Sequence, residues 1–187
     1  MTTGRLSRFT WILRQRMWLI GLTLFCNLLF SCQSHKEEDS LSESEYKEHL
    51  TNANRIIVRD EKKDIEDFIS RHQFRMDSTG TGLRIQLIQK GAGKLPVDHD
   101  RLLVAYKVFL LDGTMVYSFA EQQPDTFRIA EGEQVRGLEE AMRLLPEGSR
   151  ARLLLPAHLA YGMIGDQNKI PGATPLYYDL HFIRIIQ

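Results

Sequence analysis

The most constraining feature of the chain lies between residues 153 and 182, where two apolar runs flank a loop rich in glycine and proline. The first run, which ends at Leu155, predicts a strand that stops at Pro156, because proline lacks the N–H that a strand ladder requires. In the second run, apolar residues recur at every second position, which is the spacing of a strand with one buried face: Leu176, Tyr178, Leu180 and Phe182. The loop that contains Tyr161 and Ile170 is therefore expected to be fixed at both ends beside an aromatic strand, as one wall of an apolar pocket.

Upstream of this stretch, the chain predicts an antiparallel sheet and one short helix. Alternating apolar residues indicate strands at 83–87 and 102–110, and Asp112-Gly113 is a strong hairpin signal. Between residues 137 and 145, apolar side chains at i, i+3, i+4 and i+7 form one stripe of a short helix, which Pro146-Glu147-Gly148 ends. The fold class is therefore expected to be α+β.

Several short motifs follow one another in the C-terminal part of the chain: Val104-Ala105-Tyr106, Asp112-Gly113, the run Gln134-Val135-Arg136-Gly137-Leu138-Glu139-Glu140-Ala141, Leu159-Ala160-Tyr161-Gly162, Ile170-Pro171 and Leu176-x-Tyr178. Their order and spacing resemble those of the FKBP-type peptidyl-prolyl cis-trans isomerases over roughly residues 83–187. Several ordered motifs are specific, whereas any one of them alone is weak. The resemblance implies an FKBP-like curved antiparallel sheet wrapped around one short helix, with the pocket between them.

The resemblance also implies which residues form the pocket. The backbone N–H of Val135 would bind a carbonyl on the C-terminal side of a prolyl residue, the Tyr161 hydroxyl would hold another carbonyl, and Leu138 would form the floor under the proline ring. The residues with an implied catalytic role are Tyr106, Val135, Tyr161, Ile170 and Tyr178, and those implied to bind substrate are Val116, Tyr117, Phe127, Gln134 and Leu138. Core packing is the alternative for each, and it is weakest for Tyr161, whose hydroxyl needs a partner in its loop.

The sequence departs from the family at four of these positions and near Asp125. The family usually has an aromatic residue where Val116 stands, a second aromatic near Asp125, an aspartate at Tyr117, an apolar residue at Gln134 and a tryptophan at Leu138. Two functions therefore stay open. One is isomerisation of X–Pro bonds in proline-containing client proteins, and the other is a catalytically weak FKBP-like binding module or holdase chaperone.

Composition excludes other classes of function. A chain of 187 residues with 43% apolar and 26% charged side chains is globular, and its 24 basic and 24 acidic residues form no clustered basic run that would favour nucleic acid. Both cysteines, Cys26 and Cys32, precede the folded region, and the six histidines show no ligand spacing, so neither a metal nor a cofactor is expected. No Ser/His/Asp, Cys/His or paired-carboxylate constellation stands out.

Residues 1–31 are expected to form a lipoprotein signal peptide. A leader with four arginines and no acid precedes the apolar run 17–30, which is too short to span a membrane comfortably. Leu29-Phe30-Ser31-Cys32 then resembles a bacterial lipobox, which implies cleavage before Cys32 and acylation of that residue. The alternatives are an ordinary signal peptide and an uncleaved anchor.

The expected location is the cell envelope, with the chain anchored by lipid at Cys32 in the outer membrane and facing the periplasm. Lys36-Glu37-Glu38-Asp39 resembles an acidic export tag of surface lipoproteins as closely as it resembles a generic charged linker, and such a tag would redirect the domain to the cell surface.

An acidic tether at 32–48 and a helical extension at 49–80 are expected before the domain at 83–187. The tether is too polar to bury the apolar area that ordering requires. The extension has Ile57, Ile65, Phe68 and Ile69 along one side of a helix. This helix is expected to pack on its own domain or, alternatively, to form a dimer seam or a client-holding arm. The whole pattern most resembles the gliding-motility-associated peptidyl-prolyl isomerase lipoproteins.

Overall fold

The computed structural model describes residues 42–186, apart from the side chain of Asn54. The elements in chain order are α2 (Glu43–His72), β1 (Asp77–Ser78), β2 (Arg84–Gln89), β3 (Arg101–Leu110), β4 (Met115–Phe119), β5 (Asp125–Arg128), α3 (Arg136–Leu144), β6 (Arg150–Leu155), the 3-10 helix η1 (Ala157–Leu159) and β7 (Leu176–Ile186). Within these residues, no helix is both long and apolar enough to cross a membrane.

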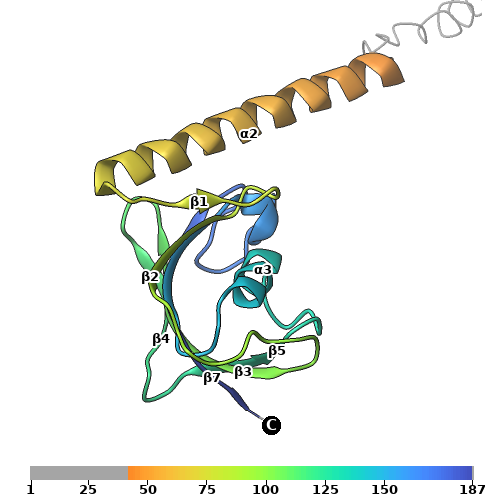
Figure 1. Cartoon of the computed structure of the whole chain (residues 1–187). Coiled ribbons are helices and arrows are strands. Elements are labelled where there is room, and N and C mark those ends of the chain that lie inside the picture. Colours follow the sequence, from red (N-terminus) through yellow and green to blue (C-terminus); the bar gives the residue numbers. More distant parts are fainter. Residues whose placement is uncertain (1–41, 187) are drawn as a thin grey trace, which may run out of the picture. The chain divides into compact units, whose positions relative to one another are not determined.

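One antiparallel sheet organises the fold. Its strands follow the order β1-β2-β6-β7-β3-β4, and β5 pairs with β3 off this path. The longest strand, β7, lies between β6 and β3, so that Tyr178 pairs with Leu153 on one side and with Val108 on the other. The sheet curves around α3, which lies against its concave face (Figure 1). The expected α+β fold, with a curved antiparallel sheet around one short helix, is confirmed.

Strict alternation along β7 separates the two faces of the sheet. Leu176, Tyr178, Leu180 and Phe182 are all buried on the inner face, because successive side chains of a strand point to opposite sides. The helix α3 contributes Leu138, Ala141 and Met142 to the same core. The inner face and α3 therefore bury each other.

Gly137 sets the distance between α3 and the sheet. A Cβ atom at this position would lie 2.6 Å from Cγ of Leu155 and 3.1 Å from Cβ of Leu159. The first contact is shorter than non-bonded carbon atoms tolerate and the second is tight, so a side chain here would force Leu155 or the first turn of α3 to move.

Helix α2 begins at Glu43, so the prediction of a tether over residues 32–48 is wrong for its last residues. The cause is a capping box. The N–H of Glu45 donates to Oγ of Ser42 over 3.3 Å, and the N–H of Ser42 donates to Oε2 of Glu45 over 2.9 Å. The Ser-x-x-Glu pattern at 42–45 is visible in the sequence. It marks a helix start that precedes the apolar residues of the extension.

The C-terminal half of α2 packs on the outer face of the sheet. Ile65 and Phe68 form a second apolar cluster with Leu154, and the Phe68 ring lies 5.4 Å from that of Tyr177. Leu154 lies on β6 and Tyr177 on β7. The residues on either side of each in its strand belong to the inner core. This half of the extension therefore packs on its own domain, as one of the two alternatives predicts.

The buried residue Met142 provides a test of the packing between α3 and the inner face of the sheet. Met142 is fully buried, whereas Leu144, two residues later on the same helix, is 52% exposed. We expect Met142→Ala to lower the free energy of unfolding by about 2–5 kcal/mol, because it leaves a cavity between α3 and the sheet. Leu144→Ala should change it by less than about 0.5 kcal/mol. Urea unfolding of the purified proteins measures both, and equal losses would contradict the arrangement of α3.

Candidate functional site

The structure brings the ten pocket residues predicted from the sequence to the concave face. Tyr106, Val116, Phe127, Leu138, Ile170 and Tyr178 belong to one buried cluster, and Tyr117, Val135 and Tyr161 pack against it half-buried. The tenth, Gln134, joins them through a hydrogen bond to Asp125. These residues come from β3, β4, β5, β7, the start of α3 and the loop after η1. Their placement agrees with a pocket, while their individual roles stay predictions.

Aromatic rings form one wall of this site. The rings of Tyr106 and Tyr178 lie 5.6 Å apart at 40°, and Phe119 lies 4.8 Å from Tyr106 on its other side. Such tilted pairs are the arrangement that aromatic quadrupoles favour. Sequence reasoning missed Phe119, although its register opposite Tyr106 follows from the hairpin between β3 and β4.

Asp125 fixes the polar end of Tyr106. The Tyr106 hydroxyl donates to Oδ2 of Asp125 over 2.5 Å, and Nε2 of Gln134 donates to the same oxygen over 2.8 Å. The N–H of Thr126 donates to the other oxygen, Oδ1, over 2.8 Å. The carboxylate that the family resemblance places at position 117 is thus supplied here from position 125. No local sequence signal indicates this pair, because the two residues lie on different strands.

Asp166 organises the loop that carries Tyr161. Its Oδ1 accepts hydrogen bonds from the N–H groups of Asn168 (2.9 Å) and Ile170 (2.7 Å), and its Oδ2 accepts one from the Tyr117 hydroxyl. Burial alone would raise the pKa of Asp166, but these donors and the N–H of Lys169 outweigh it and lower the pKa to about 2. The pattern Asp-x-Asn is a known turn signal, so the sequence could have indicated this residue.

Gly165 lets the same loop close. Its φ is +75°, and a Cβ atom would lie 2.1 Å from the carbonyl oxygen of Ile170. A side chain is therefore excluded by both the backbone conformation and the close approach of the returning chain.

Three polar groups in the pocket have no hydrogen-bond partner within residues 42–186. They are the backbone N–H of Val135 and the hydroxyls of Tyr161 and Tyr178. Buried or half-buried donors are normally satisfied. Unpaired donors beside an apolar floor therefore suit a ligand that brings carbonyl oxygens.

The tyrosine hydroxyls of the site stay protonated at every physiological pH. Burial, followed by the hydrogen bond to the Asp125 carboxylate, raises the pKa of Tyr106. Burial also raises the pKa of Tyr178 and of Tyr161, and nearby carboxylates add to the effect. These groups can donate hydrogen bonds but cannot act as bases, so the site is arranged for binding and polarisation rather than for proton transfer.

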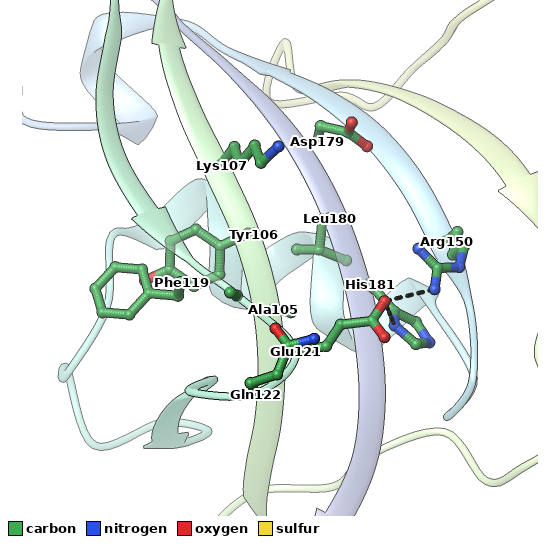
Figure 2. A pocket seen from close by; sticks show the side chains of 11 residues that line it. Ala105, Tyr106, Lys107, Phe119, Glu121, Gln122, Arg150, Asp179, Leu180 and His181 are labelled. Carbon is green, nitrogen blue, oxygen red and sulfur yellow. Dashed lines mark hydrogen bonds and ion pairs between the residues drawn. The ribbon is translucent and has the colours of Figure 1, made fainter.

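A cavity of about 280 Å³ lined mainly by other residues lies beside the central strands (Figure 2). Its charged side chains alternate along the strands with the buried residues of the inner face. Glu121 lies 2.6 Å from Nη2 of Arg150 and 3.0 Å from Nδ1 of His181, and these hydrogen bonds lower the pKa of Glu121. Three of the charged side chains of this cavity, Glu121, Arg150 and His181, therefore bind one another.

Several sequence predictions lie outside the described residues. They are the signal peptide at 1–31, the lipid attachment site Cys32, the acidic tag at 36–39 and most of the tether at 32–48. For metal binding, residues 42–186 contain no group of three or more His, Cys, Asp or Glu side chains placed to hold an ion.

Comparison with known proteins assigns this architecture to a family. Residues 93–183 match the family model of the FKBP-type peptidyl-prolyl cis-trans isomerases. The C-terminal part of the chain is an FKBP-type domain. In agreement with this, a solved peptidyl-prolyl cis-trans isomerase from Pseudomonas syringae pv. tomato superimposes with a TM-score of 0.58 at 25% identity, over 69% of this chain and 96% of the other.

The FKBP-type domain is also similar to several curated proteins. It is 41% identical over 107 residues to the macrophage infectivity potentiator of Trypanosoma cruzi, covering 56% of this chain and 54% of the relative. It is 34% identical over 112 residues to the FKBP-type 22 kDa peptidyl-prolyl cis-trans isomerase of Escherichia coli, covering 59% and 53%. It is 32% identical over 106 residues to the outer membrane protein MIP of Legionella longbeachae, covering 56% and 45%. The chain thus spans about half the length of the curated relatives it matches.

The low pKa of Asp166 provides a test of the loop geometry. A carboxylate whose pKa is lowered by folding stabilises the folded state above its unfolded pKa of 3.8 and loses that contribution as the pH falls towards 2. We expect the Asp166 carboxyl to titrate near pH 2 in ¹³C NMR, and Tyr117→Phe to move the midpoint upward by removing one donor. A wild-type midpoint at or above 3.8 would contradict the hydrogen bonds that hold this loop.

Proposed function

We propose that the protein is a peptidyl-prolyl cis-trans isomerase that acts on proline-containing client proteins. The observation that carries this proposal is the combination of an apolar pocket with unpaired donors at Val135 and Tyr161 and no base. Support comes from the family model and from the name of the Escherichia coli relative, an FKBP-type peptidyl-prolyl cis-trans isomerase. No cofactor enters the proposed reaction.

The chemistry of the X–Pro bond suits such a site. Rotation about an amide must cross a barrier of roughly 18–20 kcal/mol, because the planar bond has partial double-bond character. For X–Pro, the cis and trans forms differ by only about 1 kcal/mol, so both are populated substrates. In the twisted transition state the amide loses resonance and its carbonyl dipole shrinks. Apolar surroundings therefore destabilise the planar ground state more than the twisted state.

In this proposal each pocket residue has a defined task. Leu138, fully buried at the base of the site, supports the proline ring, and Tyr106 and Tyr178 enclose it. The Val135 N–H donates a hydrogen bond to a carbonyl on the C-terminal side of proline. The Tyr161 hydroxyl binds the carbonyl on the N-terminal side. Both ends of the peptide are then held while the bond between them rotates.

The Tyr161 hydroxyl provides the matched test. We expect Tyr161→Phe to lower kcat/KM for an X–Pro peptide by about two- to twelvefold, which corresponds to the loss of one hydrogen bond of roughly 0.5–1.5 kcal/mol. Tyr177→Phe, on the outer face beneath α2, should change it by less than about twofold. Protease-free isomerisation assays measure both. Equal rates for the two variants would remove Tyr161 from the mechanism.

A second candidate function is client holding or dimerisation through the exposed part of α2 that precedes Ile65. Ile56 and Val58 are 51% and 61% exposed on this helix, unlike Ile65 and Phe68, which the domain covers. Exposed apolar side chains on one helix favour contact with another protein. A wild-type protein that suppresses client aggregation without accelerating isomerisation would favour this candidate over the first.

We further propose that the chain is an envelope lipoprotein anchored at Cys32. The signal-like leader and the lipobox-like residues 29–32 support this, as does the name of the relative described as an outer membrane protein. Each acyl chain contributes roughly 0.8 kcal/mol per buried CH₂, so several chains give stable anchoring. Assignment to the gliding-motility-associated group, and the choice between periplasm and cell surface, belong to the same proposal.

Substitution of the lipobox cysteine tests the anchor. Cys32→Ser should yield an unlipidated, unprocessed precursor or a misplaced protein, because the modified sulfur is lost. Membrane fractionation and electrophoretic mobility measure this, and protease treatment of intact cells then distinguishes surface from periplasmic exposure. A Cys32→Ser protein that stays membrane-bound with unchanged processing would overturn the proposed anchor.

A further inference from the structure

Two carboxylates lie at the pocket and neither has a cationic partner. Asp125 and Asp166 are both half-buried, and all their hydrogen bonds within residues 42–186 come from neutral donors. Neither forms an ion pair within 4 Å among these residues. Hydrogen bonds from neutral groups do not cancel the negative charge of a carboxylate.

Both charges act on the same point of the site. Burial is the largest cause that raises the pKa of the Tyr161 hydroxyl, and the charges of Asp166, on the loop, and Asp125, on β5, raise it further. The hydroxyl of Tyr161 is the group proposed to hold the carbonyl on the N-terminal side of proline. The side chain of the residue before proline is therefore expected to lie in a negative potential.

The lysine closest in sequence to Asp166, Lys169, forms its contacts with other groups. Nζ of Lys169 donates to the carbonyl of Val116 over 3.1 Å and lies 5.1 Å from the centre of the Tyr117 ring. This lysine is thus occupied by a backbone acceptor and an aromatic face, and it forms no ion pair with Asp166 three residues earlier.

The site also has fewer aromatic rings than the family resemblance implies. Val116 stands where the family resemblance places an aromatic ring, and Asp125 lies near the position of a second. A bulky apolar side chain before proline would therefore bury less area here, and each buried methylene contributes about 0.8 kcal/mol. Of these two residues, Asp125 also adds a negative charge to the site.

Building on the proposed isomerase function, we propose that the pocket selects prolines preceded by lysine or arginine and disfavours prolines preceded by an acidic residue. Asp125 and Asp166 are the specificity-determining residues, and they act through their charge. The clients that this site favours are then basic X–Pro segments of extracytoplasmic proteins.

Matched peptides that differ only before proline test this inference. At low ionic strength, we expect kcat/KM for Lys-Pro to exceed that for Glu-Pro by about fivefold to tenfold, with Leu-Pro between them, as a partly exposed charge interaction predicts. The ratio should shrink as salt is added, because the Debye length falls from about 30 Å at 0.01 M to about 8 Å at 0.15 M. Equal rates for Lys-Pro and Glu-Pro, or a preference for Leu-Pro, would overturn it.

Variants assign the preference to the two carboxylates. Asp125→Asn combined with Asp166→Asn removes both charges while leaving an acceptor oxygen at each position, and it should bring the Lys-Pro to Glu-Pro ratio close to one. The control is Asp77→Asn on β1, at the opposite edge of the sheet from β4, which should leave the ratio unchanged. An unchanged ratio in the double variant would contradict the assignment.

Failure of this inference and failure of the proposed function give different results. If no peptide is isomerised, the enzyme proposal fails, and peptide titrations followed by NMR still compare the affinities for Lys-Pro and Glu-Pro. Tighter binding of Lys-Pro in that case supports the inference for a binding module, and equal binding overturns it. If every peptide is isomerised at one rate, the enzyme proposal holds and the inference fails.

Discussion

The packing of α3 into the concave face of the sheet is the interaction on which the rest of the structure depends. Gly137 makes this packing possible, because any side chain there would overlap Leu155. The approach buries Leu138 as the base of the pocket. The N–H of Val135 has no backbone partner because Val135 is the N-cap of the same helix. The start of α3 thus supplies both the apolar floor and one of the donors of the site.

Tyrosine and carboxylate pairs then give the pocket its polar character. Asp125 holds Tyr106, and Asp166 holds Tyr117, so each acid fixes a ring from a neighbouring strand. The resemblance to the family predicts one carboxylate, at position 117. The structure instead has a tyrosine there and carboxylates at 125 and 166. The pocket therefore has an aromatic enclosure, and its charge lies at positions 125 and 166.

Period-two and helical patterns predicted β7, the hairpin after β3 and α3 from the sequence, because each buries one regular face. The ordered motifs predicted which residues meet in the pocket. The bond between Tyr106 and Asp125 could not be predicted, because it depends on the pairing of β3 with β5 across a long connection. The early start of α2 was missed for a different reason. Its capping box is a local signal, but the polar composition around it favoured a tether.

The most direct test of the central claim is exchange spectroscopy of an X–Pro peptide in the presence of the wild-type protein. The account predicts that cis–trans exchange becomes fast compared with the uncatalysed tens to hundreds of seconds, and that the peptide shifts the amide resonance of Val135 and the ring resonances of Tyr161. Exchange at the uncatalysed rate, or accelerated exchange with both resonances unmoved, would contradict it.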